Sequence, residues 1–164
     1  MDRQLLTIYL NDHLAGATLG AHVIRRGLKA DLGHPIAPFL RELLGEVEED
    51  RRTLIGVMER FGIPRSPVKV AAAWVGERIG RLKLNGRLLG RSPLSRVEEL
   101  EFLVLGVQGK RRLWLALSRL DPPEAIRKEL DGLIARADSQ LERLEERWAP
   151  AVAEALGAGK WPVS

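Results

Sequence analysis

Apolar residues recur every three or four positions through four long stretches of the chain, a spacing typical of amphipathic helices. The stretches span residues 2–30, 36–61, 93–120 and 122–156. No sustained alternation of apolar and polar residues and no hairpin turn signal occurs, so the sequence predicts no strand. With a rise of about 1.5 Å per residue, each helix would be roughly 38 to 52 Å long. The pattern therefore predicts an all-α protein made of long helices.

Turn and capping residues separate these stretches. Gly33 and Gly62 are typical stop signals at the ends of the first two helices. Ser92 before Pro93 predicts the start of the third helix, and the sequence DPPE predicts that Asp121 caps the fourth while Glu124 completes a capping box. Two connections are short and the middle one is long. This order predicts an up-down four-helix bundle of two helical hairpins joined by a long crossover.

The crossover carries most of the positive charge. Between Arg65 and Arg96 there are eight basic residues and one acid, a net charge of +7 in a chain of net +4. Ser66 and Pro67 predict a short helix over residues 67–83. A basic surface here would bind an anionic partner, either nucleic acid or an anionic lipid head group. The predicted anion-binding residues are Arg78, Arg81, Lys83, Arg87 and Arg91.

The same charges also allow a second interpretation, in which the basic segment needs no partner. Two acidic blocks elsewhere in the chain could neutralise the segment within one domain. These blocks consist of Glu46, Glu48, Glu49, Asp50, Glu98, Glu99 and Glu101.

Acidic residues occupy positions on the helical seams where apolar residues are expected. Asp12 falls between Ile8 and Ala15 on the seam predicted for residues 2–30, and Asp50 falls on the seam of residues 36–61. A buried carboxylate is costly unless it is paired with a basic group or bound to a cation. Acids directed inward from all four helices could hold metal ions in a bundle. The predicted metal ligands are Asp12, Glu46, Asp50, Glu101 and Asp138.

Ion pairing is the alternative explanation for these acids. Arginines are abundant near them, notably Arg51, Arg52, Arg111 and Arg112. A site made of carboxylates alone would favour Mg²⁺, Mn²⁺ or Ca²⁺ over zinc, because these ions prefer oxygen ligands.

The chain resembles the ferritin-like superfamily in its helix layout and in the segment FLRELLGEVEEDRRTLIGVMERFG. It also resembles an uncharacterised bacterial ferritin-like family through AAAWVGERIGRLKLNGRLLGRSPLSRVEELE. The resemblance implies a bacterial four-helix bundle that binds iron or manganese and performs oxygen, peroxide or iron-storage chemistry. The superfamily's Glu-x-x-His pairs are absent, since Glu49 follows Glu46 at that spacing and residues 122–156 contain no histidine.

Two functional hypotheses follow from the sequence. The first is a ferritin-like bundle of unassigned function with a degenerate carboxylate metal site. The second is a non-enzymatic interaction module that uses the basic crossover to bind an anionic partner or a protein. We identify no catalytic residues, because neither a Ser-His-Asp set nor a phosphate-binding Gly-rich loop can be argued from the chain.

Length and composition indicate how many domains the chain forms and where in the cell it is expected. A chain of 164 residues fits a single domain. It has no cysteine and no run of about 20 apolar residues, so we expect a cytoplasmic protein without a transmembrane segment. Gly16 and Gly20, with Ala17 and Ala21 beside them, form a groove of small side chains that predicts close approach of a neighbouring helix. Such a surface could support a homodimer.

Overall fold

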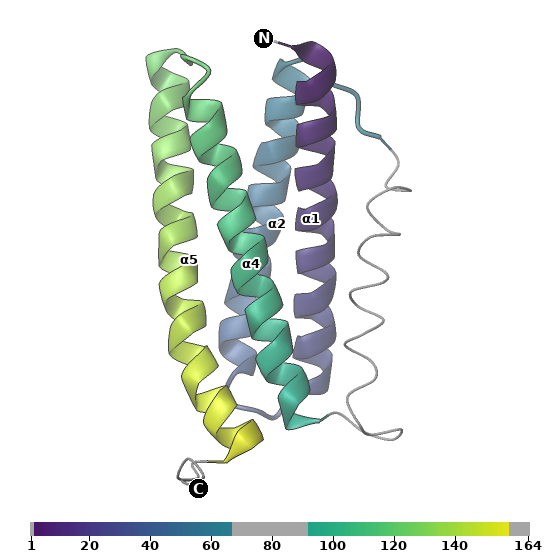
Figure 1. The fold of residues 1–164 in the computed structure, drawn as a ribbon, viewed down its shortest axis with the longest axis vertical. Coiled ribbons are helices and arrows are strands. Elements are labelled where there is room, and N and C mark those ends of the chain that lie inside the picture. Colours follow the sequence, from purple (N-terminus) through teal and green to yellow (C-terminus); the bar gives the residue numbers. More distant parts are fainter. Residues whose placement is uncertain (1, 67–91, 158–164) are drawn as a thin grey trace, which may run out of the picture.

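The computed structural model describes residues 2–66 and 92–157. Within these ranges the chain forms four α-helices and no strand, which confirms the predicted all-α class. The helices are α1 (Arg3–Ala30), α2 (Ala37–Arg60), α4 (Pro93–Ser118) and α5 (Glu124–Leu156), and each end lies within two residues of its predicted position (Figure 1). The predicted helix at residues 67–83 and the five predicted anion-binding residues lie outside the described residues.

Side-chain caps start two of the helices. The Asp2 carboxylate accepts hydrogen bonds from the backbone N–H groups of Gln4 and Leu5 at the start of α1. The Ser92 hydroxyl accepts one from the Leu94 N–H at 3.3 Å at the start of α4, as predicted for this residue. These bonds satisfy backbone donors that have no partner in the first turn of a helix.

The cap predicted at Asp121 is wrong. The N-cap of α5 is Pro123, with no side-chain cap, and Asp121 has a positive φ of 51°. A residue that precedes proline is disfavoured in the helical conformation, so Pro122 cannot open the helix in front of Pro123. The helix therefore begins two residues later, at Glu124.

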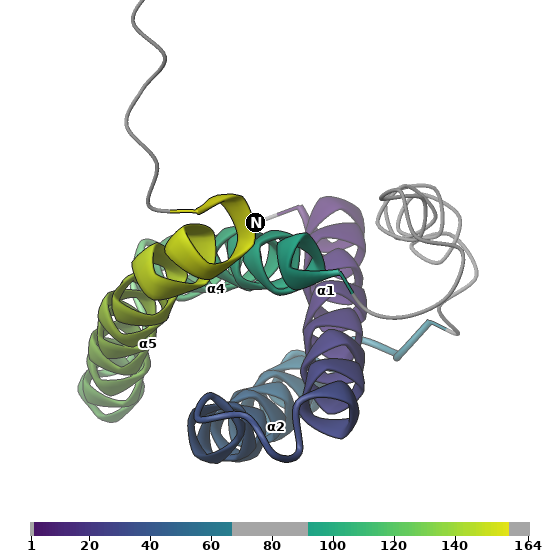
Figure 2. The same cartoon turned by 90° about the horizontal axis from the view of Figure 1, so that it is seen from below.

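The four helices form two antiparallel hairpins, α1–α2 and α4–α5, that lie side by side. Seen along their length, they follow an arc in the order α5, α4, α1, α2 (Figure 2). Helix α4 packs against both α5 and α1. Helix α2 ends at the opposite end of the assembly from the start of α4 (Figure 1).

The buried residues confirm the predicted apolar seams of α2 and α5. Leu43 and Leu54 on α2, and Leu133 and Leu144 on α5, are all buried. None of the described helices is long and apolar enough to cross a membrane.

The seam predicted for α1 is wrong in its first half. Leu5 and Ile8 are 64% and 52% exposed, whereas Leu10 and Leu14 lie in the core. Apolar residues occur on more than one face of α1, so their spacing alone does not determine which face is buried. The choice is made by the neighbouring helices, since Leu10 and Leu14 belong to one core cluster with residues of α2, α4 and α5.

Candidate functional site

A layer of paired charges crosses the middle of the core. Asp50 is 3% exposed, and its carboxylate accepts hydrogen bonds from Lys110 Nζ at 2.5 Å and from Arg136 at 3.2 Å. The Lys110 ammonium also donates to Gln140 Oε1. Burial lowers the pKa of Lys110, and the charge of Asp50 opposes that effect. Asp50 is therefore ion-paired inside the bundle, with partners other than the four arginines that the sequence indicated.

The same layer continues along the boundary between α2 and α5, which we call the α2–α5 seam. The Gln140 amide donates to Glu46 Oε2 at 2.9 Å, and Arg143 binds the same carboxylate at 2.6 Å and Glu42 at 3.0 Å. Arg136 reaches Glu49 as well, at 3.0 Å. The seam thus consists of charged side chains whose charges are matched across the two hairpins.

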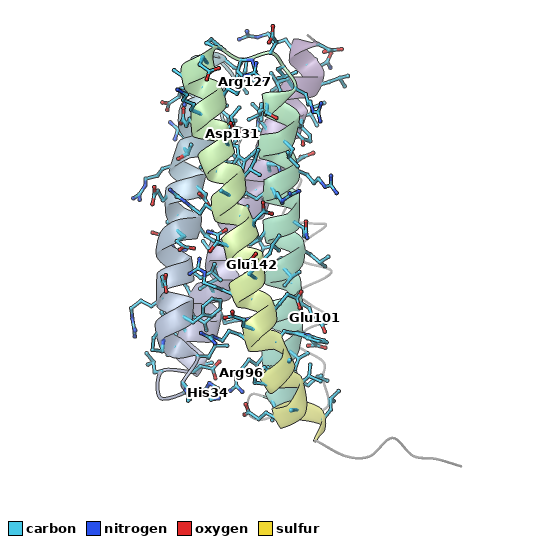
Figure 3. All side chains as sticks on the ribbon, turned by 90° about the vertical axis from the view of Figure 1, so that its left-hand side faces the viewer. His34, Arg96, Glu101, Arg127, Asp131 and Glu142 are labelled. Carbon is cyan, nitrogen blue, oxygen red and sulfur yellow. The ribbon has the colours of Figure 1, made fainter. Side chains whose placement is uncertain are left out.

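The other three predicted metal ligands have no hydrogen bond or ion pair with this layer among the described residues. Asp12 is exposed on α1, and Asp138 pairs with Arg111 at 2.5 Å on the surface. Glu101 is exposed in the first half of α4, where it accepts a hydrogen bond from Trp148 Nε1 at 3.1 Å (Figure 3).

The described residues accordingly contain no group of three or more histidine, aspartate or glutamate side chains placed to hold a metal ion. The five predicted ligands are not brought together. The physical reason differs between them. Asp12 and Glu101 are exposed. Glu46, Asp50 and Asp138 are each paired with a basic side chain.

Most of the acidic residues that the sequence offered as partners for the basic segment form ion pairs with other parts of the chain. Five of the seven form ion pairs with basic residues of α1, α4 or α5. The pairs are Glu46–Arg143, Glu48–Arg25, Glu49–Arg136, Asp50–Lys110 and Glu99–Arg26. The segment's own end residues are paired too, Arg65 with Glu59 at 3.7 Å and Arg96 with Asp31 at 3.0 Å.

A charged cluster joins the hairpins at one end of the bundle. Arg96 at the start of α4 binds Asp31 at 3.0 Å and Glu154 near the end of α5 at 2.5 Å. His34, in the connection between α1 and α2, accepts a hydrogen bond from the Ile36 N–H at Nδ1 and lies 3.4 Å from Glu154 through Nε2 (Figure 3). The hydrogen bond from Arg96 is the main reason that the pKa of Glu154 is lowered.

A cavity of about 380 Å³ lies between α1, α2 and α4. Its wall is mostly apolar and includes four glycines, with charged residues only at Asp12, Asp50, Arg51 and Lys110. His13 also lines the cavity, and burial lowers its pKa. The sequence does not predict this cavity, although Gly16 and Gly20 belong to its wall.

No family model, curated protein or solved structure matches this chain.

Proposed function

We propose that this protein is a non-enzymatic interaction module whose basic segment, residues 65–96, binds an anionic partner. The observation that supports the proposal is the engagement of the acids. The segment could have been neutralised inside the domain by two acidic blocks, but five of those seven acids already pair with basic residues of α1, α4 or α5.

The charge distribution adds to this argument. Residues 67–91 contain six basic residues and one acid, a net charge of +5 that exceeds the net charge of the whole chain. A concentration of positive charge attracts polyanions over distances of about 10 Å at moderate salt, because screening is incomplete within that range.

The alternative hypothesis, a degenerate carboxylate metal site, has less support from the described residues. Glu46 and Asp50 are paired with lysine, arginine or glutamine, and no group of potential ligands converges within residues 2–66 and 92–157. We also propose that the fold is ferritin-like, and the arrangement of two helical hairpins supports this proposal. We propose no metal chemistry for this chain.

Titration of the full chain with a fluorescently labelled DNA duplex at several salt concentrations tests the proposed function. We expect salt-dependent binding, with a slope of log K against log[salt] that becomes less negative by up to about 3 in Arg78→Ala/Arg81→Ala/Arg87→Ala, since each lost phosphate contact contributes about 0.9. The matched control is Arg41→Ala/Arg52→Ala/Arg112→Ala, which removes the same charge from exposed positions of α2 and α4.

A control variant that weakens binding as much as the segment variant would show that only net charge matters and would contradict the proposal. Anionic phospholipid vesicles form a second arm of the experiment. Binding to vesicles but not to DNA would identify a lipid surface as the anionic partner, and binding to neither would exclude the proposed function.

A further inference from the structure

We infer that residues 67–91, which connect the two hairpins, pack an apolar helix face into the cavity between α1, α2 and α4. The positions of the flanking residues, the length of the connection and the spacing of its apolar residues support this occupant. The packing is independent of the proposed function, because it uses apolar residues of the connection, whereas the proposed function uses its basic residues.

The cavity presents apolar surface that none of the described residues fills. Leu103 and Val107 lie in its wall, and its volume is about 380 Å³. It is open to solvent on one side, where Leu105 and Gly106 are exposed. Removal of such surface from water would stabilise an apolar occupant. The wall does not by itself identify this occupant, but the chain on either side of residues 67–91 does.

Both ends of the connection are held beside walls of the cavity. The Ser66 N–H donates to Asn11 Oδ1 at 2.7 Å, and Asn11 directly precedes Asp12, which lines the cavity on α1. At the other end, Ser92 caps α4, the helix that forms the opposite wall. Residues 67–91 therefore begin at one wall of the cavity and end at the start of the helix that forms the other.

The length of the connection fits the distance between its ends. From Asn11 to its C-cap Asp31, helix α1 rises about 30 Å, and Asp31 pairs with Arg96 at the start of α4. A helix over the predicted residues 67–83 would extend about 25 Å in the same direction. Residues 84–91 would then add up to about 26 Å in an extended conformation. The chain can therefore lie along the cavity as a helix and still reach α4.

Apolar residues of the connection recur at the spacing of one helix face. The members of this face are Val68, Ala71, Val75, Ile79 and Leu82. A helix with its side chains is about 10–12 Å wide, so it would lie along the open side of the cavity and insert only this face. Arg81 belongs to a different face of the same helix and would stay hydrated. The packing consequently does not require the burial of the Arg81 charge, which would be unfavourable.

Glycines in the wall would allow this helix to approach closely. Gly16 and Gly20 on α1, and Gly106 and Gly109 on α4, line the cavity, and a Cβ added at any of them would meet no atom within 4 Å among the described residues. The close approach of a neighbouring helix that the sequence predicts at Gly16 and Gly20 is therefore not made by the described residues. A helix over residues 67–83 would supply that neighbour.

Paramagnetic NMR of the full chain tests this position of the connection. The chain has no cysteine, so Ala73→Cys carries a nitroxide at a single site, on the helix face opposite to Val75. We expect strong loss of amide peak intensity at Gly16 and Gly106, relative to the same sample after reduction of the nitroxide. Gly45 should lose little intensity, because it is an exposed glycine of α2 outside the cavity.

Val75→Asp and Val70→Asp are a matched pair of variants for the same measurement. Each introduces one carboxylate into the connection, but only Val75 belongs to the apolar face. We expect Val75→Asp to abolish the intensity loss at Gly106 and Val70→Asp to retain it. Circular dichroism verifies that both variants keep the helices of the bundle.

Three results would overturn the inference. The first is equal intensity of Gly106 with the oxidised and the reduced nitroxide, and the second is an intensity loss that persists in Val75→Asp. The third comes from a mixture of isotope-labelled chains without nitroxide and unlabelled chains that carry it. Intensity loss at Gly106 in this mixture would show that the connection of a second copy occupies the cavity.

Discussion

Asp50 and Lys110 place two opposite charges where the rest of the core is aliphatic. Their side chains are 3% and 13% exposed, and Gln140, which binds both, is fully buried. A buried ion pair of this kind contributes little net stability compared with apolar residues of similar size, but the loss of one partner leaves the other charge without compensation.

We therefore expect Asp50→Leu to lower the free energy of unfolding by about 3 kcal/mol. The double variant Asp50→Leu/Lys110→Met should recover most of this loss, because it removes both charges. Urea denaturation monitored by circular dichroism measures the difference. Asp138→Leu is the control, since its partly exposed pair with Arg111 should contribute less than about 1 kcal/mol. A double variant as unstable as Asp50→Leu would contradict this account of the pair.

At the scale of single elements, an ion pair between Arg96 and Glu154 joins the start of α4 to the end of α5. Arg96 donates to the Glu154 carboxylate and His34 lies 3.4 Å away, so the pKa of Glu154 is below its ordinary value of 4.5. Asp31 shares Arg96 from the other side, at 3.0 Å. In the unfolded chain Glu154 has its ordinary pKa and binds a proton more readily than in the folded chain. Its stabilising contribution is therefore complete above about pH 4.5 and is lost as the pH falls through the lowered value.

We expect wild type to be more stable than Glu154→Gln at pH 7, with a gap that narrows as the pH falls below about 4.5. Urea denaturation at a series of pH values between 7 and 3 measures this gap. Glu145→Gln, an exposed acid on the same helix, should show no comparable pH dependence relative to wild type. A gap between wild type and Glu154→Gln that stays constant over this range would exclude the ion pair as its cause.

Sequence patterns predicted the positions of the helices well, but they predicted the burial and the partners of the acidic residues poorly. Helix ends are marked by local signals such as Ser92, and the single apolar faces of α2 and α5 leave one possible orientation. The orientation of α1 depends on which neighbours cover it, and this is a tertiary property. Asp12 was consequently predicted inside but lies at the surface, while the partners of Asp50 come from α4 and α5, 60 and 86 residues away in the chain.

The cavity shows the same limit of local information. Its glycines are visible in the sequence, but open space arises only from the distance between α1 and α4, which depends on side chains of the whole bundle. Spacing within one helix predicts which residues share a face, and it does not predict whether that face is covered.

At the scale of the whole molecule, the two hairpins meet in two different ways. Helices α1 and α4 are packed against each other, with the cavity beside their contact. Helices α2 and α5 lie at the two ends of the arc and are connected by long polar side chains of the α2–α5 seam (Figure 2). Because Gln140 donates to both Glu46 and Asp50, it links the Arg143 pair to the Arg136 pair.

This connection predicts that the ion pairs of the α2–α5 seam are energetically coupled to one another. We expect Arg136→Ala and Arg143→Ala to be non-additive, with a coupling of about 0.5–1 kcal/mol in the free energy of unfolding, since residues that share one network are energetically coupled. A double-mutant cycle by urea denaturation measures the coupling. In Gln140→Leu the coupling should fall to within about 0.3 kcal/mol of zero, as for independent sites. Arg60→Ala with Arg143→Ala is the control cycle, because Arg60 pairs separately with Glu129 across the same two helices. Additivity of Arg136→Ala and Arg143→Ala in the wild-type background would mean that the hairpins are held by independent ion pairs.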